Sequence, residues 1–132
     1  MKPIIFVVGA GAGIGGHVAK RFASEDYHAV LCRRSNEVGL HALVAEIEAE
    51  GGSAEGHLLN AVEPDTIEGR IAAVEADVGP IEVVLFNLGA QIGNKMLSET
   101  TYKQFELGWR LATFALFRTV QTLVPHMEQR GA

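Results

Sequence analysis

The segment at residues 4–16 constrains the fold of this 132-residue chain more than any other. An apolar run at 3–8 is typical of a strand buried on both faces of a parallel sheet. It passes directly into a run with five glycines, after which a helix is predicted from Gly13. A glycine-rich turn between a strand and a helix lets backbone N–H groups approach a pyrophosphate at the helix N-terminus. The segment therefore predicts a nucleotide-binding α/β fold.

The rest of the chain alternates between short apolar segments and longer amphipathic ones. Further strands are predicted at 28–33, 54–59 and 81–86. Further helices are predicted at 36–50, 64–78 and 101–129, the last with a kink or an early end at Pro125. This alternation predicts one domain, residues 1–132, with a Rossmann-type, doubly wound parallel sheet in the order 3-2-1-4 and three α/β/α layers. The first and fourth strands are then neighbours, and a ligand is expected above their carboxyl ends.

Each predicted helix has an apolar stripe that is expected to face the sheet. In the first helix the stripe consists of Ile14, Val18 and Phe22. In the second and third helices it consists of Leu40, Leu43, Val44 and Ile47, and of Ile67, Ile71, Val74 and Val78. Thr101 and Gln104 have the spacing of a capping box at the start of the fourth helix.

Several nucleotide-binding motifs can be laid over the glycine run. A Walker-type phosphate loop is excluded because no Gly-Lys-Ser/Thr follows. The ordinary G-x-G-x-x-G pattern fails from Gly9, because Ile14 takes the place of its third glycine, and from Gly11 it begins late for the predicted strand. The pattern G-x-x-x-G-I-G begins where the strand ends, and it assigns Gly9, Gly13, Ile14 and Gly15 to the phosphate site. Two further glycines are expected to relax the turn and to allow helix packing: Gly11 and Gly16.

The end of the second predicted strand indicates which cofactor binds. An Asp or Glu at this place would accept hydrogen bonds from ribose hydroxyls, as in proteins that prefer NAD. The strand ends instead in Arg33 and Arg34, whose guanidinium groups would pair with a 2′-phosphate that a carboxylate would repel. NADP(H) is therefore the predicted cofactor. A methyltransferase that uses S-adenosylmethionine, whose glycine loop fits Gly9, Gly11 and Gly13, is disfavoured because it also needs an acidic residue here.

Together these features resemble the short-chain dehydrogenase/reductase family over the whole chain. The spacing of the glycines is typical of that family. After the fourth predicted strand, Asn87, Gly89 and Ala90 match the family's asparagine–alanine–glycine motif, with a leucine in place of the usual alanine. Asn60, followed by Ala61, stands where the family has an acidic residue near the adenine. The resemblance assigns all five of these residues to the cofactor site.

The resemblance implies an oxidoreductase that transfers hydride between the nicotinamide of NADP(H) and a carbonyl or alcohol substrate. In the family this chemistry needs a Tyr-x-x-x-Lys pair, a preceding serine and an asparagine in the central helix. The tyrosine is the general acid/base, and the lysine lowers its pKa. Neither Tyr27 nor Tyr102 has a lysine four residues later, and Ala112 stands at the asparagine position.

The sequence ends about where the family's fifth strand would begin, so we expect no catalytic residue in these 132 residues. We interpret the chain as the cofactor-binding half of a longer enzyme, incomplete relative to the family fold. The alternative is a non-catalytic NADP(H)-binding or interaction module of the same fold. Family members commonly dimerise through the long central helix, so homo-oligomers that form through 101–129 are expected.

Composition disfavours several other classes. A net charge of −5 argues against a face that binds nucleic acid. The single cysteine, Cys32, permits no intrachain disulfide and fits a reducing cytoplasm. No secretory leader is recognisable, and no apolar run approaches the roughly 20 residues of a membrane span. The five histidines have no partner at a metal-ligand spacing, so we interpret them as surface or packing residues and expect no metal site.

Overall fold

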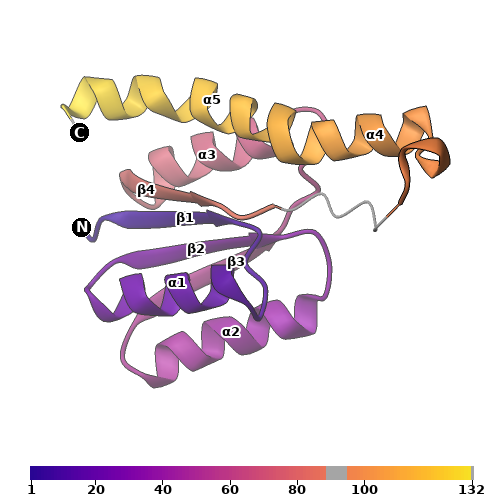
Figure 1. Cartoon of the computed structure of the whole chain (residues 1–132). Helices are drawn as coiled ribbons and strands as arrows, with labels where there is room; N and C mark the ends of the chain where they lie inside the picture. Colours follow the sequence, from indigo (N-terminus) through magenta and orange to yellow (C-terminus); the bar gives the residue numbers. More distant parts are fainter. Residues whose placement is uncertain (89–94, 132) are drawn as a thin grey trace.

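A computed structural model describes residues 1–88 and 95–131 of the chain. Its centre is a four-stranded parallel sheet in the order β3-β2-β1-β4 (Figure 1). The strands are β1 (Ile4–Val8), β2 (His28–Arg33), β3 (Ser53–Leu58) and β4 (Ile81–Phe86). The order predicted from the sequence is confirmed, and the third strand begins and ends one residue earlier than predicted.

Helices cover both faces of the sheet, which gives the three expected layers (Figure 1). One face carries α1 (Ile14–Ser24) and α2 (Glu37–Ala49), and the other carries α3 (Thr66–Asp77) and α5 (Ala115–Arg130). Strand β1 alternates between the two cores, so that Ile4 and Phe6 pack on one face while Ile5 and Val7 pack on the other. All four side chains are fully buried, which explains why this strand is apolar at every position.

Helix α1 does not pack as its apolar stripe predicts. Ile14 is 68% exposed, and Val18 and Phe22 are only half-buried. The face buried against the sheet consists of the small residues Gly15, Gly16, Ala19 and Ala23. Small residues allow the helix to lie close to β1 and β2, so that Val18 and Phe22 pack at the margin of this core while Ile14 lies outside it. The prediction that Ile14 begins the inward face is therefore wrong.

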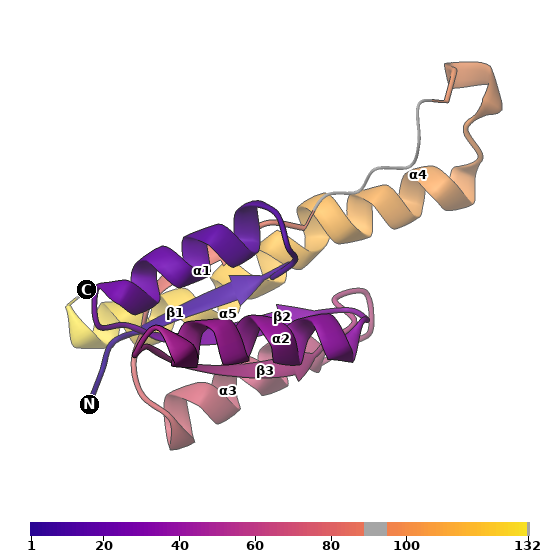
Figure 2. The same ribbon diagram turned by 90° about the horizontal axis from the view of Figure 1, so that it is seen from below.

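The long C-terminal helix consists of three parts. Helix α4 (Tyr102–Trp109) passes through a π-helical segment (Arg110–Phe114) into α5. A short 3-10 helix, η1 (Leu97–Glu99), precedes it, and the capping box of Thr101 and Gln104 is confirmed. Figure 2 shows that α5 lies along the sheet, whereas α4 extends beyond it.

The helix continues through Pro125 and ends at Gly131, which has a left-handed conformation. Of the two outcomes predicted at Pro125, a kink or an early end, the early end is therefore wrong, and the helix runs one residue beyond the predicted bound of 129. Leu123 and Met127, which lie on either side of the proline, both pack against the core that α3 and β4 share, and the irregular hydrogen bonding occurs at 110–114 instead. Within the described residues, no helix is long and apolar enough to cross a membrane.

Candidate functional site

The turn at residues 9–13, called the glycine turn below, leaves the carboxyl end of β1. The N–H groups of Gly9 and Ala10 both donate to the carbonyl oxygen of Cys32 over 2.9 Å, which ties the turn to β2. Gly9 has a φ of +98°, and a Cβ added there would lie 2.7 Å from the carbonyl oxygen of Asn87. Both the left-handed backbone and the neighbouring chain therefore require glycine at this position.

Two glycines at the start of α1 serve close packing. A Cβ on Gly15 would collide with the carbonyl oxygen of Gly9, and a Cβ on Gly16 would collide with the carbonyl oxygen of Gly11. The first turn of the helix therefore rests directly on the backbone of the glycine turn. Gly16 has the packing role expected for it, and the structure adds the same role for Gly15.

Gly13 differs from these neighbours because the space beside it is open. A Cβ on Gly13 would meet no described atom within 4 Å, and the same holds for Gly11. Gly13 is the N-cap of α1, and no side chain accepts a hydrogen bond from the first N–H groups of this helix within the described residues. Unpaired N–H groups at a helix N-terminus that face open space suit an anionic group.

Asn87 lies against the glycine turn, as the strand order predicts. Its N–H donates to the carbonyl oxygen of Val8 over 2.8 Å, and its side-chain amide donates to the carbonyl oxygen of Gly9 over 3.4 Å. Leu88, which replaces the family's usual alanine, packs against the core. The other two motif residues, Gly89 and Ala90, lie outside the described residues.

Arg33 ends β2 and lines a cavity of about 290 Å³ beside the glycine turn. The cavity is also lined by Gly11, Ala12, Gly16, Lys20, Asn36, Gly39, Ala42, Leu43 and Glu46. Lys20 forms a salt bridge with Glu46, so that these two charges compensate one another. Arg33 is half-buried and Arg34 is exposed, and neither forms a salt bridge within residues 1–88 and 95–131. A guanidinium group without an acidic partner thus lies beside the open turn.

The turn at residues 60–63, called the polar turn below, follows β3 at the same edge of the sheet. The N–H of Leu59 donates to the carbonyl oxygen of Arg33 over 2.9 Å, which places Asn60 next to the end of β2. Within the turn, the Oδ1 atom of Asn60 accepts from the N–H of Val62 over 3.2 Å. Ala61 is 4% exposed and packs in the core, so only its backbone can take part in polar contacts.

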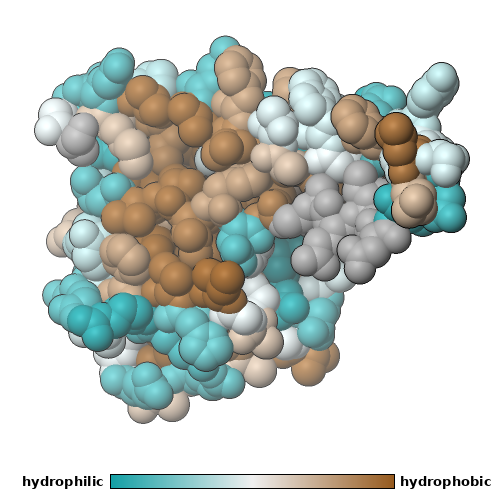
Figure 3. Space-filling view, viewed as in Figure 1, coloured by the Kyte–Doolittle hydropathy of each residue, from teal (hydrophilic) through white to brown (hydrophobic). Residues whose placement is uncertain are grey.

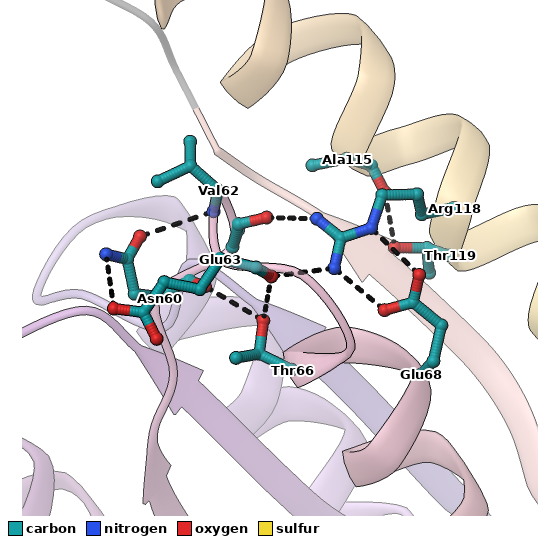
Figure 4. Close-up of polar contacts among 9 residues, drawn as sticks. Asn60, Val62, Glu63, Thr66, Glu68, Ala115, Arg118 and Thr119 are labelled. Atoms are coloured by element: carbon teal, nitrogen blue, oxygen red, sulfur yellow. Dashed lines mark hydrogen bonds and ion pairs between the residues drawn. The ribbon is translucent and has the colours of Figure 1, made fainter.

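Arg118 on α5 holds the polar turn, and reasoning from the sequence missed it. Its guanidinium binds Glu68 of α3 and the carbonyl oxygens of Ala61 and Glu63 (Figure 4). Hydrogen bonds from Arg118 lower the pKa of Glu68, although partial burial of this carboxyl opposes the effect. The available signal was a single arginine within the largely apolar stretch 111–124, where a buried charge requires a partner.

Two of the five histidines bind one carboxylate along the β3 edge of the sheet. The Nε2 atoms of His28 and His57 lie 2.8 and 2.6 Å from the two carboxylate oxygens of Glu55. Burial alone would raise the pKa of Glu55, but the hydrogen bonds from the histidines outweigh burial and lower it. Within the described residues, no group of three or more His, Cys, Asp or Glu side chains could hold a metal ion.

A parallel sheet whose first strand passes through a glycine-rich turn into a helix defines a dinucleotide-binding α/β fold. The family model described as short chain dehydrogenase matches residues 3–132. The chain therefore belongs to the short-chain dehydrogenase/reductase family of oxidoreductases.

Individual members of the family show how much of the fold the chain covers. Gluconate 5-dehydrogenase of Gluconobacter oxydans is 32% identical over 95% of this chain and 48% of its own length. A short-chain dehydrogenase from Rhodopseudomonas palustris is 36% identical and superposes with a TM-score of 0.90, over 98% of this chain and 59% of that one. A metagenomic short-chain oxidoreductase in complex with NADP is 26% identical, with a TM-score of 0.89 over 95% and 56% of the two chains. The chain spans about half the length of the curated relatives it matches.

Proposed function

We propose that residues 1–132 are the NADP(H)-binding domain of an oxidoreductase that transfers hydride between nicotinamide and a carbonyl or alcohol substrate. The observation that carries the proposal is the cavity shared by the glycine turn and Arg33. The glycine turn ends at open helix N-terminal N–H groups, and Arg33 contributes a guanidinium group to the cavity. A ligand with a pyrophosphate and a further phosphate has the charges that this arrangement would bind.

The same cavity favours NADP(H) over NAD(H). No carboxylate at the end of β2 is available for ribose hydroxyls, because the strand ends in Arg33 and Arg34 follows it. Several family members with the same fold, including the metagenomic oxidoreductase and an actinorhodin polyketide ketoreductase, have been solved with NADP or NADPH. We propose the following cofactor-binding residues: Gly9, Gly13, Ile14, Gly15, Arg33, Arg34, Asn60, Ala61, Asn87, Gly89 and Ala90.

We assign no catalytic residue to this chain. When bound, the nicotinamide ring would donate or accept the hydride, while the residues of this chain bind and orient the dinucleotide. Tyr102 is 95% exposed at the start of α4, and Tyr27 packs edge-on against Phe22 with ring centroids 5.1 Å apart. Neither position is suited to general acid/base chemistry at the glycine turn.

Ala112 favours the second candidate function, a non-catalytic NADP(H)-binding or interaction module. It lies in the π-helical segment, at the position where the family has an asparagine of the proton relay. The two candidates differ in turnover. The longer protein that contains this chain would oxidise NADPH in the presence of a carbonyl panel if it is an enzyme, and would bind NADPH without consuming it if it is a module.

We also propose that the chain self-associates through the helices at 101–129. Large apolar side chains are exposed along α4 and α5, among them Phe105, Phe117 and Val120. Figure 3 shows hydrophobic residues gathered over β4 and the adjoining part of α5. Replacing Phe117 by Glu should shift the protein to a smaller species in sedimentation experiments if this face joins two copies, and an unchanged mass would contradict the proposal.

Titration with NADPH and NADH tests the cofactor proposal. We expect NADPH to bind at least about tenfold more tightly, and the combined change Arg33→Ala with Arg34→Ala to remove most of this preference. Arg21→Ala is the control, because Arg21 is an exposed arginine that pairs with Glu25 elsewhere on the surface. Equal affinity of the unmodified protein for both cofactors would contradict the choice of NADP(H).

Substitution of Gly13 tests the phosphate site. Gly13→Val should leave the fold intact, because the added side chain points into open space, yet it should abolish binding by blocking the pyrophosphate. Gly69→Val on α3 is the matched control, since Gly69 is equally open but lies away from the glycine turn. Unchanged binding to the Gly13 variant would show that the pyrophosphate lies elsewhere.

A further inference from the structure

The guanidinium of Arg118 joins two elements of the fold. Its side chain is largely buried, and it makes four hydrogen bonds (Figure 4). Two of them go to Glu68, from Nε over 2.9 Å and from Nη2 over 2.7 Å. The other two go to carbonyl oxygens of the polar turn, those of Ala61 and Glu63. The Glu68 carboxylate balances the charge and accepts from two of the five N–H donors, and two of the remaining three hold the turn.

One of these bonds reaches the side chain of Asn60 through a single peptide group. The carbonyl oxygen of Ala61, which accepts from Arg118, and the N–H of Val62 belong to the same planar peptide. That N–H donates to the Oδ1 atom of Asn60 over 3.2 Å. The orientation that Arg118 imposes on the peptide is therefore passed to the asparagine side chain. Thr66 fixes the other parts of the turn, because its hydroxyl donates to the carbonyl oxygens of Asn60 and Glu63, each over 2.9 Å.

We propose that Arg118 is a positioning residue that orients Asn60 to read the adenine ring of the dinucleotide. The inference rests on the proposed function, and it adds a residue on the central helix that does not touch the cofactor. If Arg33 binds a phosphate on the adenosine ribose, the adenine attached to that ribose lies next to it along the edge formed by the carboxyl ends of the strands. The bond between Leu59 and Arg33 places Asn60 there.

The chemistry of Asn60 suits adenine. An asparagine amide can accept from the exocyclic amine of adenine and donate to a ring nitrogen, which is a bidentate match. The Oδ1 atom keeps one lone pair after it accepts from Val62, and the amide nitrogen has only a long contact of 3.4 Å to Glu63. Hypoxanthine carries an oxygen in place of the amine and a proton on the ring nitrogen, so it would meet this amide with mismatched groups.

Arginine is required for this role because of its shape. The planar guanidinium can bind a carboxylate with two parallel bonds and still reach two carbonyl groups, whereas a lysine ammonium lacks the fixed fork of donors. Arg130 is a matched control on the same helix. It binds Glu75 and the carbonyl oxygen of Ile81 at the opposite end of the sheet. Arg118→Lys and Arg130→Lys therefore remove similar bonds, but only the first touches the polar turn.

The test compares NADPH with its hypoxanthine analogue, in which only the base differs. We expect the unmodified protein to prefer NADPH by about tenfold, the value of one bidentate base contact. In Arg118→Lys the ratio of the two affinities should fall to near one, whereas in Arg130→Lys it should stay at the unmodified value. Asn60→Ala should also lose the preference, and it covers the case in which Arg118→Lys does not fold. A ratio of affinities is not changed by a loss of overall stability alone.

Each other outcome overturns the inference. An unchanged ratio in Arg118→Lys would mean that the arginine only stabilises the fold, and equal losses in both lysine variants would mean a general effect on the structure. Retained preference in Asn60→Ala, or none in the unmodified protein, would show that Asn60 does not read the base. These results leave the proposed function intact as long as NADPH binds. Failure of the unmodified protein to bind either dinucleotide would overturn both.

Discussion

The glycine turn and the polar turn lie at the same edge of the sheet, but they are held in opposite ways. The glycine turn depends on missing side chains: Gly9, Gly15 and Gly16 let three stretches of backbone touch. The polar turn depends on a single long side chain, because Arg118 reaches from α5 to hold two of its carbonyl groups. The difference teaches that one edge of a sheet can be built by close packing in one half and by buried polar contacts in the other.

The two kinds of support should respond differently to substitution and to pH. Close packing of backbone atoms leaves no room to adjust, so a single added methyl group has a large effect. A network of hydrogen bonds around a charged pair tolerates small shifts but depends on the ionised state of its carboxylate. Four experiments on the folded chain separate these behaviours.

The largest effect is expected at Gly9. Gly9→Ala should lower the free energy of unfolding by about 3 kcal/mol or more, because it combines a left-handed backbone with a collision against Asn87. Urea denaturation measures the loss. Gly11→Ala is the control and should change stability by less than about 1 kcal/mol, since nothing described lies within 4 Å of the added atom. Equal losses for both variants would mean that the glycine turn is not held by close packing.

A somewhat smaller loss is expected at the polar turn. Arg118→Met should cost about 2–3 kcal/mol, because it leaves Glu68 and two carbonyl groups without their donor. Arg110→Met is the matched control, since Arg110 forms an exposed pair with Glu106 on the same helix and should cost under about 0.5 kcal/mol. Thermal and urea unfolding of both variants provide the comparison. A loss of unfolding free energy in Arg118→Met no larger than that in the control would mean that Arg118 does not hold the polar turn.

The pH dependence should distinguish the two turns more sharply. The pKa of Glu68 lies below its ordinary value of 4.5, so the ionised carboxylate stabilises the fold above that value, and the contribution is lost as the pH falls through the lowered pKa. Glu68→Gln should therefore cost about 1 kcal/mol near neutral pH and progressively less in acid. The cost of Gly9→Ala should not vary over the same range. A constant cost of Glu68→Gln would contradict this assignment.

The smallest effect is expected in the labelling of Cys32 by a thiol reagent. Burial raises the pKa of this thiol to about 12, so the folded protein should react only when it opens. The N–H of Gly9 donates to the carbonyl oxygen of Cys32. In the Gly9→Ala variant, Cys32 should therefore react faster with the reagent than the global stability of the variant alone implies. In the Arg118→Met variant, Cys32 should react only at the rate that global unfolding of the protein allows. Labelling of both variants in proportion to stability would show that the glycine turn does not open locally.

Sequence reasoning recovered the parts of this edge that depend on order along the chain. The strand order followed from the alternation of apolar and amphipathic segments, and it brought Asn87 to Gly9. It failed where packing overrode a local pattern. Ile14 belongs to a clear apolar stripe, yet the helix buries its small residues instead, because they permit a closer approach to the sheet. Pro125 predicts a kink or an early end, yet the helix continues beyond it to Arg130, where contacts of α5 with α3 and β4 support it.

The sequence by itself determined the parallel sheet, its order and the position of the glycine turn, because these depend on periodicity and on residues close together in the chain. Only the tertiary structure decided which glycines of this segment are closely packed and which, Gly11 and Gly13, have open space beside them. It also decided that Arg118 holds the carbonyl oxygen of Ala61, 57 residues away. Contacts of that kind arise from the packing of α5 against α3 on one face of the sheet. No local sequence pattern predicts which residues of the two helices come into contact. The physical reason is that a buried charge must find its partners in space, wherever they lie in the chain.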